Sequence, residues 1–187
     1  AGNVGAADRV ATGCFRSGDR AVLHGARGRC EEVGRKMAGG NIRTFLLQRH
    51  LLIDHRLHQL IDDGVTQVVE IACGLSPRGH RFCQQYPQLT YIETDLPDMA
   101  QRKQQLLTEH HVLSERHKVM QINIFADDGD LSLAHVLGQL DTRTPVVVIT
   151  EGLAHYFPLA GISEFWRTLA TSLPHFPQAP HRASQYP

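Results

Sequence analysis

Hydrophobic and polar positions along the chain follow two patterns, one typical of helices and the other of short buried strands. Residues 45–61 carry apolar side chains at helical spacing, and the run closes at Asp62, Asp63 and Gly64. The pattern predicts strands at residues 67–72, 89–94, 118–125 and 145–150, and helices at residues 41–62, 77–86, 96–113, 131–140 and 158–173. Strands that alternate with helices predict an α/β fold around a parallel sheet with right-handed crossovers.

Composition divides the chain into three parts. Residues 1–40 are rich in glycine and arginine and have little apolar periodicity, which predicts an irregular arm or cap. Residues 41–173 contain the predicted helices and strands, and residues 174–187 form a proline-containing tail without periodicity. With 187 residues and 42% apolar content, the chain can bury one sizeable core.

Charge and cysteine content argue against several classes of partner. The 19 basic and 19 acidic residues balance, so no net charge attracts nucleic acid or an anionic membrane. No apolar run reaches the roughly 18 to 20 residues needed to span a bilayer. The cysteines and histidines lack the spacing of zinc ligands, so we predict no metal site. These features favour a reduced, cytoplasmic setting.

Residues that directly follow the predicted strands are candidates for ligand binding, because ligands of open α/β sheets bind at the carboxyl ends of strands. Gly74 lets a ligand approach the backbone closely, and the next helix start offers N–H groups to an anion. Asp95 follows the second strand, where a carboxylate commonly binds a ribose. A structural role explains two of these residues as well as ligand binding does, namely packing for Gly74 and helix capping for Asp95. Glu151 is different, because a carboxylate after an apolar strand needs a donor partner, which favours a functional role.

Four motifs in sequence order resemble the leucine carboxyl methyltransferase family, which includes the tetracenomycin-type polyketide O-methyltransferases. They lie at residues 49–54, 68–79, 91–97 and 149–157. The resemblance covers about residues 41–173. It implies a Rossmann-like class I methyltransferase fold, a mostly parallel sheet with helices on both faces, and S-adenosylmethionine lying across the strand ends.

The resemblance also implies roles for single residues. The implied cofactor contacts are Arg49 for the methionine carboxylate, Glu151 for the methionine ammonium, the loop with Glu70, Ala72 and Gly74 for the methionine part, Asp95 for the ribose, and Asn123 and Ile124 for the adenine. A zwitterionic tail requires such cationic and anionic partners. The sequence departs from the family, which usually has glycine at Ala72 and aspartate at Ser76 and Asn123. Ala72 narrows the backbone approach, and Asn123 exchanges a carboxylate for an amide that both donates and accepts.

The activity implied by the resemblance is O-methylation of a small polyketide-like phenol or carboxylate. A carboxylate acceptor, with a pKa near 4, is already ionised, whereas a phenol, with a pKa near 10, benefits from a general base. His155 and Tyr156 lie beside the implied cofactor edge, but packing of the helix start accounts for them better. No catalytic residue is therefore identified from the sequence.

The strand at residues 146–149 is apolar at every position, which is typical of a strand with neighbours on both edges. The family fold continues with further strands that the 174–187 tail is too short to build. We therefore expect a truncated fold, incomplete at its C-terminal end, whose open strand edge favours self-association and whose activity is reduced or lost.

Two other functions stay open. A nicotinamide-dependent oxidoreductase shares the strand, glycine turn and helix, but the sequence lacks GxGxxG, and Pro77 removes an N–H that a pyrophosphate would use. A non-catalytic cofactor-binding or interaction module would use the open edge of the fourth strand for docking.

Overall fold

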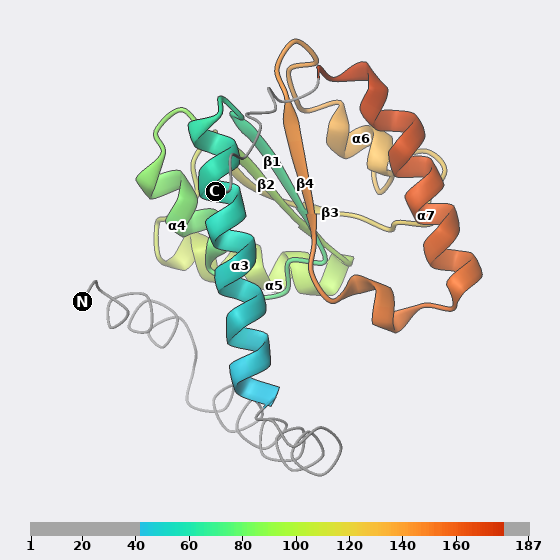
Figure 1. Ribbon diagram of the computed structural model, residues 1–187, viewed down its shortest axis with the longest axis horizontal. Coiled ribbons are helices and arrows are strands. Elements are labelled where there is room, and N and C mark those ends of the chain that lie inside the picture. The colour runs from blue at the N-terminus through green and yellow to red at the C-terminus, as the bar shows by residue number, and fades with distance from the viewer. Residues whose placement is uncertain (1–41, 178–187) are drawn as a thin grey trace, which may run out of the picture. The chain divides into compact units, whose positions relative to one another are not determined.

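The computed structural model describes residues 42–177, drawn as coloured ribbon in Figure 1. The chain forms two compact units, Ala1–Gln59 and Leu60–Pro187. The described part of the first unit consists of residues 42–59 of helix α3 (Ile42–Asp62). The predicted arm at residues 1–40 and most of the predicted tail lie outside the described residues, so the predicted domain boundaries stay predictions.

The second unit is built around a four-stranded sheet. Its strands are β1 (Gln67–Ile71), β2 (Thr90–Asp95), β3 (His117–Gln121) and β4 (Val146–Thr150). They pair in the order β3-β2-β1-β4, and every pair is parallel. In this register Val69 in β1 lies between Ile92 of β2 and Val148 of β4. The predicted α/β fold class, built on a parallel Rossmann-like sheet, is confirmed, and β1 lies between β2 and β4.

Helices cover both faces of the sheet (Figure 1). The elements between and after the strands are α4 (Arg78–Gln85), α5 (Pro97–Glu109), α6 (Leu133–Leu137), the 3₁₀ helix η1 (Leu153–Tyr156), α7 (Leu159–Ser172) and the 3₁₀ helix η2 (Leu173–His175). Because side chains alternate along a strand, Val69 and Ile71 of β1 point to the α6 and α7 face. Glu70 points to the opposite face, where it meets α4.

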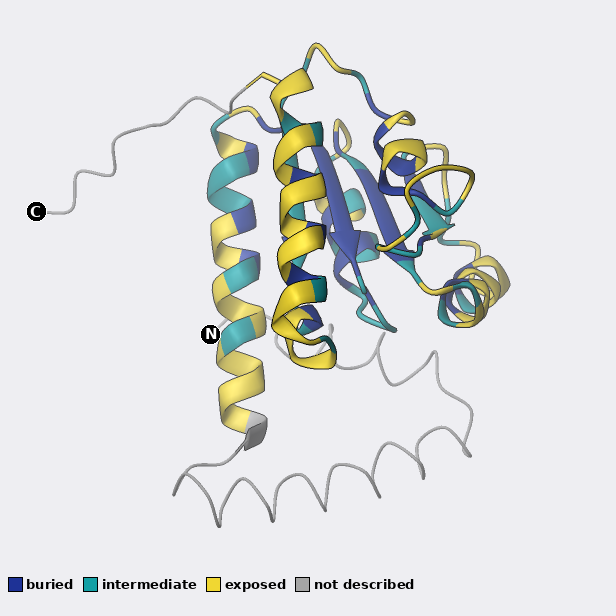
Figure 2. Cartoon of the chain, turned by 90° about the vertical axis from the view of Figure 1, so that its right-hand side faces the viewer, coloured by how far each residue is buried: buried dark blue, intermediate teal, exposed yellow. Residues whose placement is uncertain are grey.

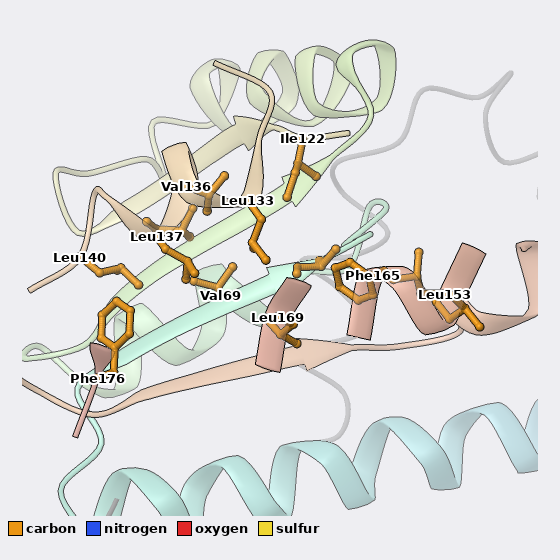
Figure 3. Close-up of a cluster of buried hydrophobic side chains, with 13 residues drawn as sticks. Val69, Ile122, Leu133, Val136, Leu137, Leu140, Leu153, Phe165, Leu169 and Phe176 are labelled. Atoms are coloured by element: carbon orange, nitrogen blue, oxygen red, sulfur yellow. The ribbon is translucent and has the colours of Figure 1, made fainter. Parts of the chain in front are cut away.

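The apolar core lies between the sheet and helices α6 and α7 (Figure 3). Its members are Val69, Ile71, Ile92, Ile122, Leu133, Val136, Leu137, Leu140, Leu153, Ile162, Phe165, Leu169 and Phe176. Figure 2 shows the same division, with buried strands inside and exposed residues on the outer helix surfaces. Burying one such side chain contributes about 1.5 to 3 kcal/mol, so this cluster is the main stabilising feature of the unit. Phe176 extends the core beyond residue 173, where the sequence predicted only an irregular tail.

Three predicted elements are clearly shorter in the structure. The helix predicted at residues 96–113 ends at Glu109, and a turn with His111 at φ +53° follows. The third strand ends at Gln121 and not at residue 125, because the Asn123 N–H donates to the Leu131 carbonyl at 2.8 Å and a turn follows. The helix predicted at residues 131–140 covers only Leu133–Leu137. The Ser132 hydroxyl accepts the His135 N–H at 3.1 Å, which sets the helix start, and Gly138 follows its last residue.

Of the other predicted helix boundaries, the glycine stop of α3 is present, and the start of α4 is shifted by one residue. Gly64 adopts φ +102° and donates its N–H to the Ile61 carbonyl at 3.0 Å, as expected of a glycine stop. Helix α4 begins at Arg78, one residue later than predicted, with Pro77 at the N-cap position. The helices within residues 42–177 include none with the length and apolar character that crossing a membrane requires.

Candidate functional site

The loop after β1 forms the centre of the candidate site. Two of its residues adopt left-handed backbone conformations, Ala72 with φ +58° and Gly74 with φ +51°. The Cys73 N–H donates to the Thr94 carbonyl at 3.0 Å, which fixes the loop to the neighbouring strand β2. A Cβ added at Gly74 would meet no atom within 4 Å. The backbone at this turn therefore faces open space, as binding of a ligand against it requires.

Ala72 occupies a conformation that suits glycine. For an L-residue the left-handed region costs about 1 to 2 kcal/mol, because Cβ approaches the carbonyl oxygen. The structure thus gives a physical reason for the glycine that the family usually has at this position. Ala72 takes the backbone path that suits a glycine at this position, at the expense of local strain.

Asp95 connects the end of β2 to this loop. Its Oδ2 accepts the Gly74 N–H at 2.7 Å, and its Oδ1 accepts the Leu96 N–H at 2.8 Å. The N-cap residue of α5 is Leu96, and no side chain caps that helix, so the capping explanation for Asp95 is not met. Each carboxylate oxygen can accept more than one hydrogen bond, which leaves capacity for ribose hydroxyls.

Glu151 follows β4 on the other side of the central strand and is held by Arg78. The Arg78 Nη2 donates to Glu151 Oε2 at 2.8 Å, while its Nη1 donates to Glu70 Oε1. Glu70 also accepts the Tyr91 hydroxyl at Oε2, at 2.6 Å. The donor partner that the sequence required for Glu151 is therefore Arg78, which sequence reasoning did not identify. A carboxylate within the buried strand β1 was the signal for a buried cation.

The environment of Glu70 changes its titration. Burial raises the pKa of the Glu70 carboxyl, and this effect outweighs the opposing charge of Arg78. Burial also raises the pKa of Tyr91 well above its usual value, and the Glu70 charge adds to the rise. Tyr91 therefore acts as a hydrogen-bond donor to Glu70 and not as a base.

A second buried charge cluster lies on the same face of the sheet. Glu93 accepts hydrogen bonds from Lys103 at 2.8 Å and has the His117 ring nitrogen at 2.9 Å. A Cβ added at Gly79 would lie 2.6 Å from the Glu93 Cδ, so α4 packs here only because residue 79 is glycine. Burial raises the pKa of Glu93, but the hydrogen bond with His117 and the charge of Lys103 together hold it below its usual value. This cluster joins α4, α5 and β3 beneath the loop after β1.

The implied adenine contacts lie directly after β3. The Asn123 side-chain oxygen accepts the Phe125 N–H at 3.1 Å, so its amide nitrogen is the group left to donate to a ligand. Ile124 is half-buried and packs against the apolar core. An aspartate oxygen would accept the same N–H, so Asn123 keeps the local turn and adds an N–H donor.

Three further residues were singled out in the sequence, namely Arg49, His155 and Tyr156. Arg49 lies on α3 in the first unit, so its contact with the methionine carboxylate stays a prediction. His155 and Tyr156 lie in η1, directly after Glu151, and both are exposed. Within residues 42–177 no cluster of His, Cys, Asp or Glu has the geometry of a metal site.

The order of the strands brings the predicted residues to one edge of the sheet. Asp95 ends β2, the Ala72 and Gly74 turn follows β1, and Glu151 follows β4, on three strands that are neighbours. A contact with Gly74 ties Asp95 to the central loop. Ligands of open α/β sheets bind at this edge, so the three groups form a candidate nucleotide-binding site.

A model of the leucine carboxyl methyltransferase family matches residues 10–170. The chain therefore belongs to the leucine carboxyl methyltransferase family, as the four sequence motifs predicted. This membership agrees with the predicted class, the S-adenosylmethionine-dependent methyltransferases.

Two curated relatives agree with this assignment. A Frankia alni protein that carries the name of an S-adenosyl-L-methionine-dependent methyltransferase is 34% identical over 112 residues, which cover 59% of this chain and 38% of the relative. Leucine carboxyl methyltransferase 1 of Eremothecium gossypii is 27% identical over 129 residues, which cover 59% of this chain and 40% of the relative. The chain thus aligns with about two fifths of the length of each relative.

Among solved structures, PKMT2 from Rickettsia typhi in complex with AdoHcy aligns with a TM-score of 0.43 and 12% sequence identity. The alignment covers 58% of this chain and 19% of that protein.

Proposed function

We propose that this chain carries the S-adenosylmethionine site of an O-methyltransferase whose acceptor is a small polyketide-like phenol or carboxylate. The observation that carries the proposal is the set of groups at the carboxyl edge of the sheet. Asp95 and Glu151 lie on either side of the open Gly74 turn, on the two strands that flank β1. A ligand with a ribose at one end and an ammonium at the other fits this order.

The chemistry requires little of the protein beyond placement. S-adenosylmethionine would supply the methyl group. In-line attack by the acceptor oxygen would form the new C–O bond as the bond between the methyl carbon and the sulfonium sulfur breaks, and the sulfur would leave as a neutral thioether. Asp95 accepts the ribose hydroxyls, Glu151 accepts the ammonium, and the Ala72 and Gly74 backbone lies against the connecting chain. Placement of two reactants in this way contributes about 7 to 11 kcal/mol to a reaction of this type.

The acceptor class can be tested by methyl transfer. The chain is incubated with S-adenosylmethionine that carries a labelled methyl group, together with either a phenol or a carboxylate of similar size. A carboxylate acceptor is already ionised at pH 6, so its methylation should change little between pH 6 and pH 9, whereas methylation of a phenol should rise over this range. Labelled protein in place of labelled small molecule would contradict the proposed acceptor.

A second candidate function is a non-catalytic cofactor-binding module. The observation that favours it is β4, which pairs only with β1 among the described strands and so forms one edge of the sheet. An unpaired edge can add a strand from a partner or from a second copy of this chain. Binding of S-adenosylhomocysteine without turnover, together with dimers whose fraction rises with protein concentration, would support this function over the enzymatic one.

A further inference from the structure

The guanidinium of Arg78 links two carboxylates from two different strands. Its Nη1 donates to Glu70 in β1, and its Nη2 donates to Glu151 after β4, at 2.8 Å. Arg78 and Glu70 are both buried, with relative exposures of 1% and 2%, and Glu151 has 8% side-chain exposure. The planar guanidinium thus holds an oxygen of Glu70 and an oxygen of Glu151 in a fixed relation to each other.

Arg78 is itself anchored at the candidate site. It is the first residue of α4, directly after the loop that follows β1, and its backbone N–H donates to the Ser76 hydroxyl at 3.3 Å. Glu70 is anchored in turn, because the Tyr91 hydroxyl donates to its carboxylate at 2.6 Å and Thr94 donates to its carbonyl at 3.1 Å. A rigid chain of contacts therefore runs from β2 through β1 to the loop after β4.

We propose that Arg78 is a positioning residue that orients the Glu151 carboxylate for the ligand ammonium, with Glu70 as its fixed support. The proposal rests on the proposed function, in which Glu151 accepts the ammonium of the methionine part. Glu70, which the resemblance implied to be a cofactor contact, then acts on the site through Arg78 and not by touching the ligand. This gives a role to a carboxylate that points away from the core and into α4.

The test compares two ligands on the Arg78→Lys variant. S-adenosylhomocysteine carries the amino-acid tail, whereas 5′-methylthioadenosine keeps the adenosine and thioether and lacks the tail. Lysine keeps the charge, but its single ammonium does not reproduce the fork that holds two carboxylates at once. We expect the affinity for S-adenosylhomocysteine, measured by calorimetry, to fall about tenfold, and the affinity for 5′-methylthioadenosine to stay the same.

A general structural defect would weaken both ligands, so equal losses would overturn the proposal, as would an unchanged affinity for S-adenosylhomocysteine. The matched control is Arg143→Lys, at an exposed ion pair with Asp141, which should leave both affinities unchanged. Failure of the wild-type chain to bind either ligand would instead show that the proposed function is wrong.

A double-mutant cycle with Glu151→Gln gives a second test. Because Arg78 acts through Glu151, the fold loss of affinity for S-adenosylhomocysteine in Arg78→Lys/Glu151→Gln should be smaller than the product of the fold losses in the two single variants. A fold loss equal to that product would overturn the proposal. If Arg78→Lys does not fold, Glu70→Gln replaces it, since this variant keeps Arg78 and weakens only its support. In Glu70→Gln too, only the affinity for S-adenosylhomocysteine should fall. An unchanged affinity for this ligand would contradict the proposal.

Discussion

Replacement of Ala72 by glycine should stabilise the protein, although most substitutions at a binding loop do the opposite. Ala72 adopts φ +58°, where an L-residue costs about 1 to 2 kcal/mol relative to its usual conformation. Glycine removes this strain but increases the entropy of the unfolded chain, at a cost of about 0.5 to 1 kcal/mol. The balance is a gain of about 0 to 1.5 kcal/mol in the free energy of unfolding, centred near 1 kcal/mol.

The assay is urea unfolding, followed by circular dichroism, with a thermal melt as a second measurement. For a chain of this size a gain of 1 kcal/mol corresponds to a rise of about 2 to 4 °C in Tm. The matched control is Ala170→Gly, an exposed position within α7, where glycine should lower the stability by up to about 1 kcal/mol. Opposite signs at the two positions would support the account.

Destabilisation by Ala72→Gly to the same extent as by Ala170→Gly would refute the reasoning, because it would show that Ala72 carries no left-handed strain in solution. The substitution also has a functional consequence. It restores the glycine that is usual in the family, so the affinity for S-adenosylhomocysteine should be equal to or higher than that of the wild type.

Two further predictions concern the buried charges and the core. Glu93 has a lowered pKa and Glu70 a raised one, each relative to a usual value of about 4.5. The Glu93 contribution to stability is therefore present above pH 4.5 and is lost as the pH falls through its folded pKa, whereas the Glu70 contribution is lost as the pH rises above 4.5. The free energy of unfolding of each variant is compared with that of the wild type by urea unfolding at pH 4 and at pH 7. From pH 4 to pH 7, Glu93→Gln should lose stability relative to the wild type, and Glu70→Gln should gain it. A change of the same sign in both variants would contradict the assignment. Phe165→Ala should lower the free energy of unfolding by about 3 to 5 kcal/mol, because Phe165 lies in the core and is 1% exposed. The neighbouring Trp166 is 44% exposed, so Trp166→Ala should lower the free energy of unfolding much less in the same assay.

The elements that carry a strong local signal were predictable from the sequence. Strand β4 has a continuous apolar run, and β1 has valine and isoleucine on both sides of Glu70. Helix α3 ends at Asp62, just before Gly64, whose conformation only glycine adopts without strain. The third strand was predicted too long because Ile122 and Ile124 look like strand residues. Their side chains do enter or border the core, but the backbone between them bonds with Leu131 and leaves the ladder.

The candidate site was predictable only in part. Asp95 and Glu151 follow from the rule that ligands bind at strand ends, and the structure places both at one edge of the sheet. The contact of Arg78 with Glu70 and Glu151 joins residues 8 and 73 positions apart in the sequence, so no local pattern shows it. Phe176 was missed for the same reason, since a single aromatic residue in a proline-containing segment gives no periodic signal.

The central claim is that the carboxyl edge of the sheet binds S-adenosylmethionine. The measurement that tests it most directly is calorimetric titration of the chain with S-adenosylhomocysteine, repeated on Asp95→Ala and Glu151→Ala. Asp98→Ala, an exposed carboxylate in the first turn of α5, is the matched control. The account predicts micromolar binding that is retained in Asp98→Ala and lost in the other two variants. Absence of binding by the folded wild-type chain, or equal binding by all four proteins, would contradict it.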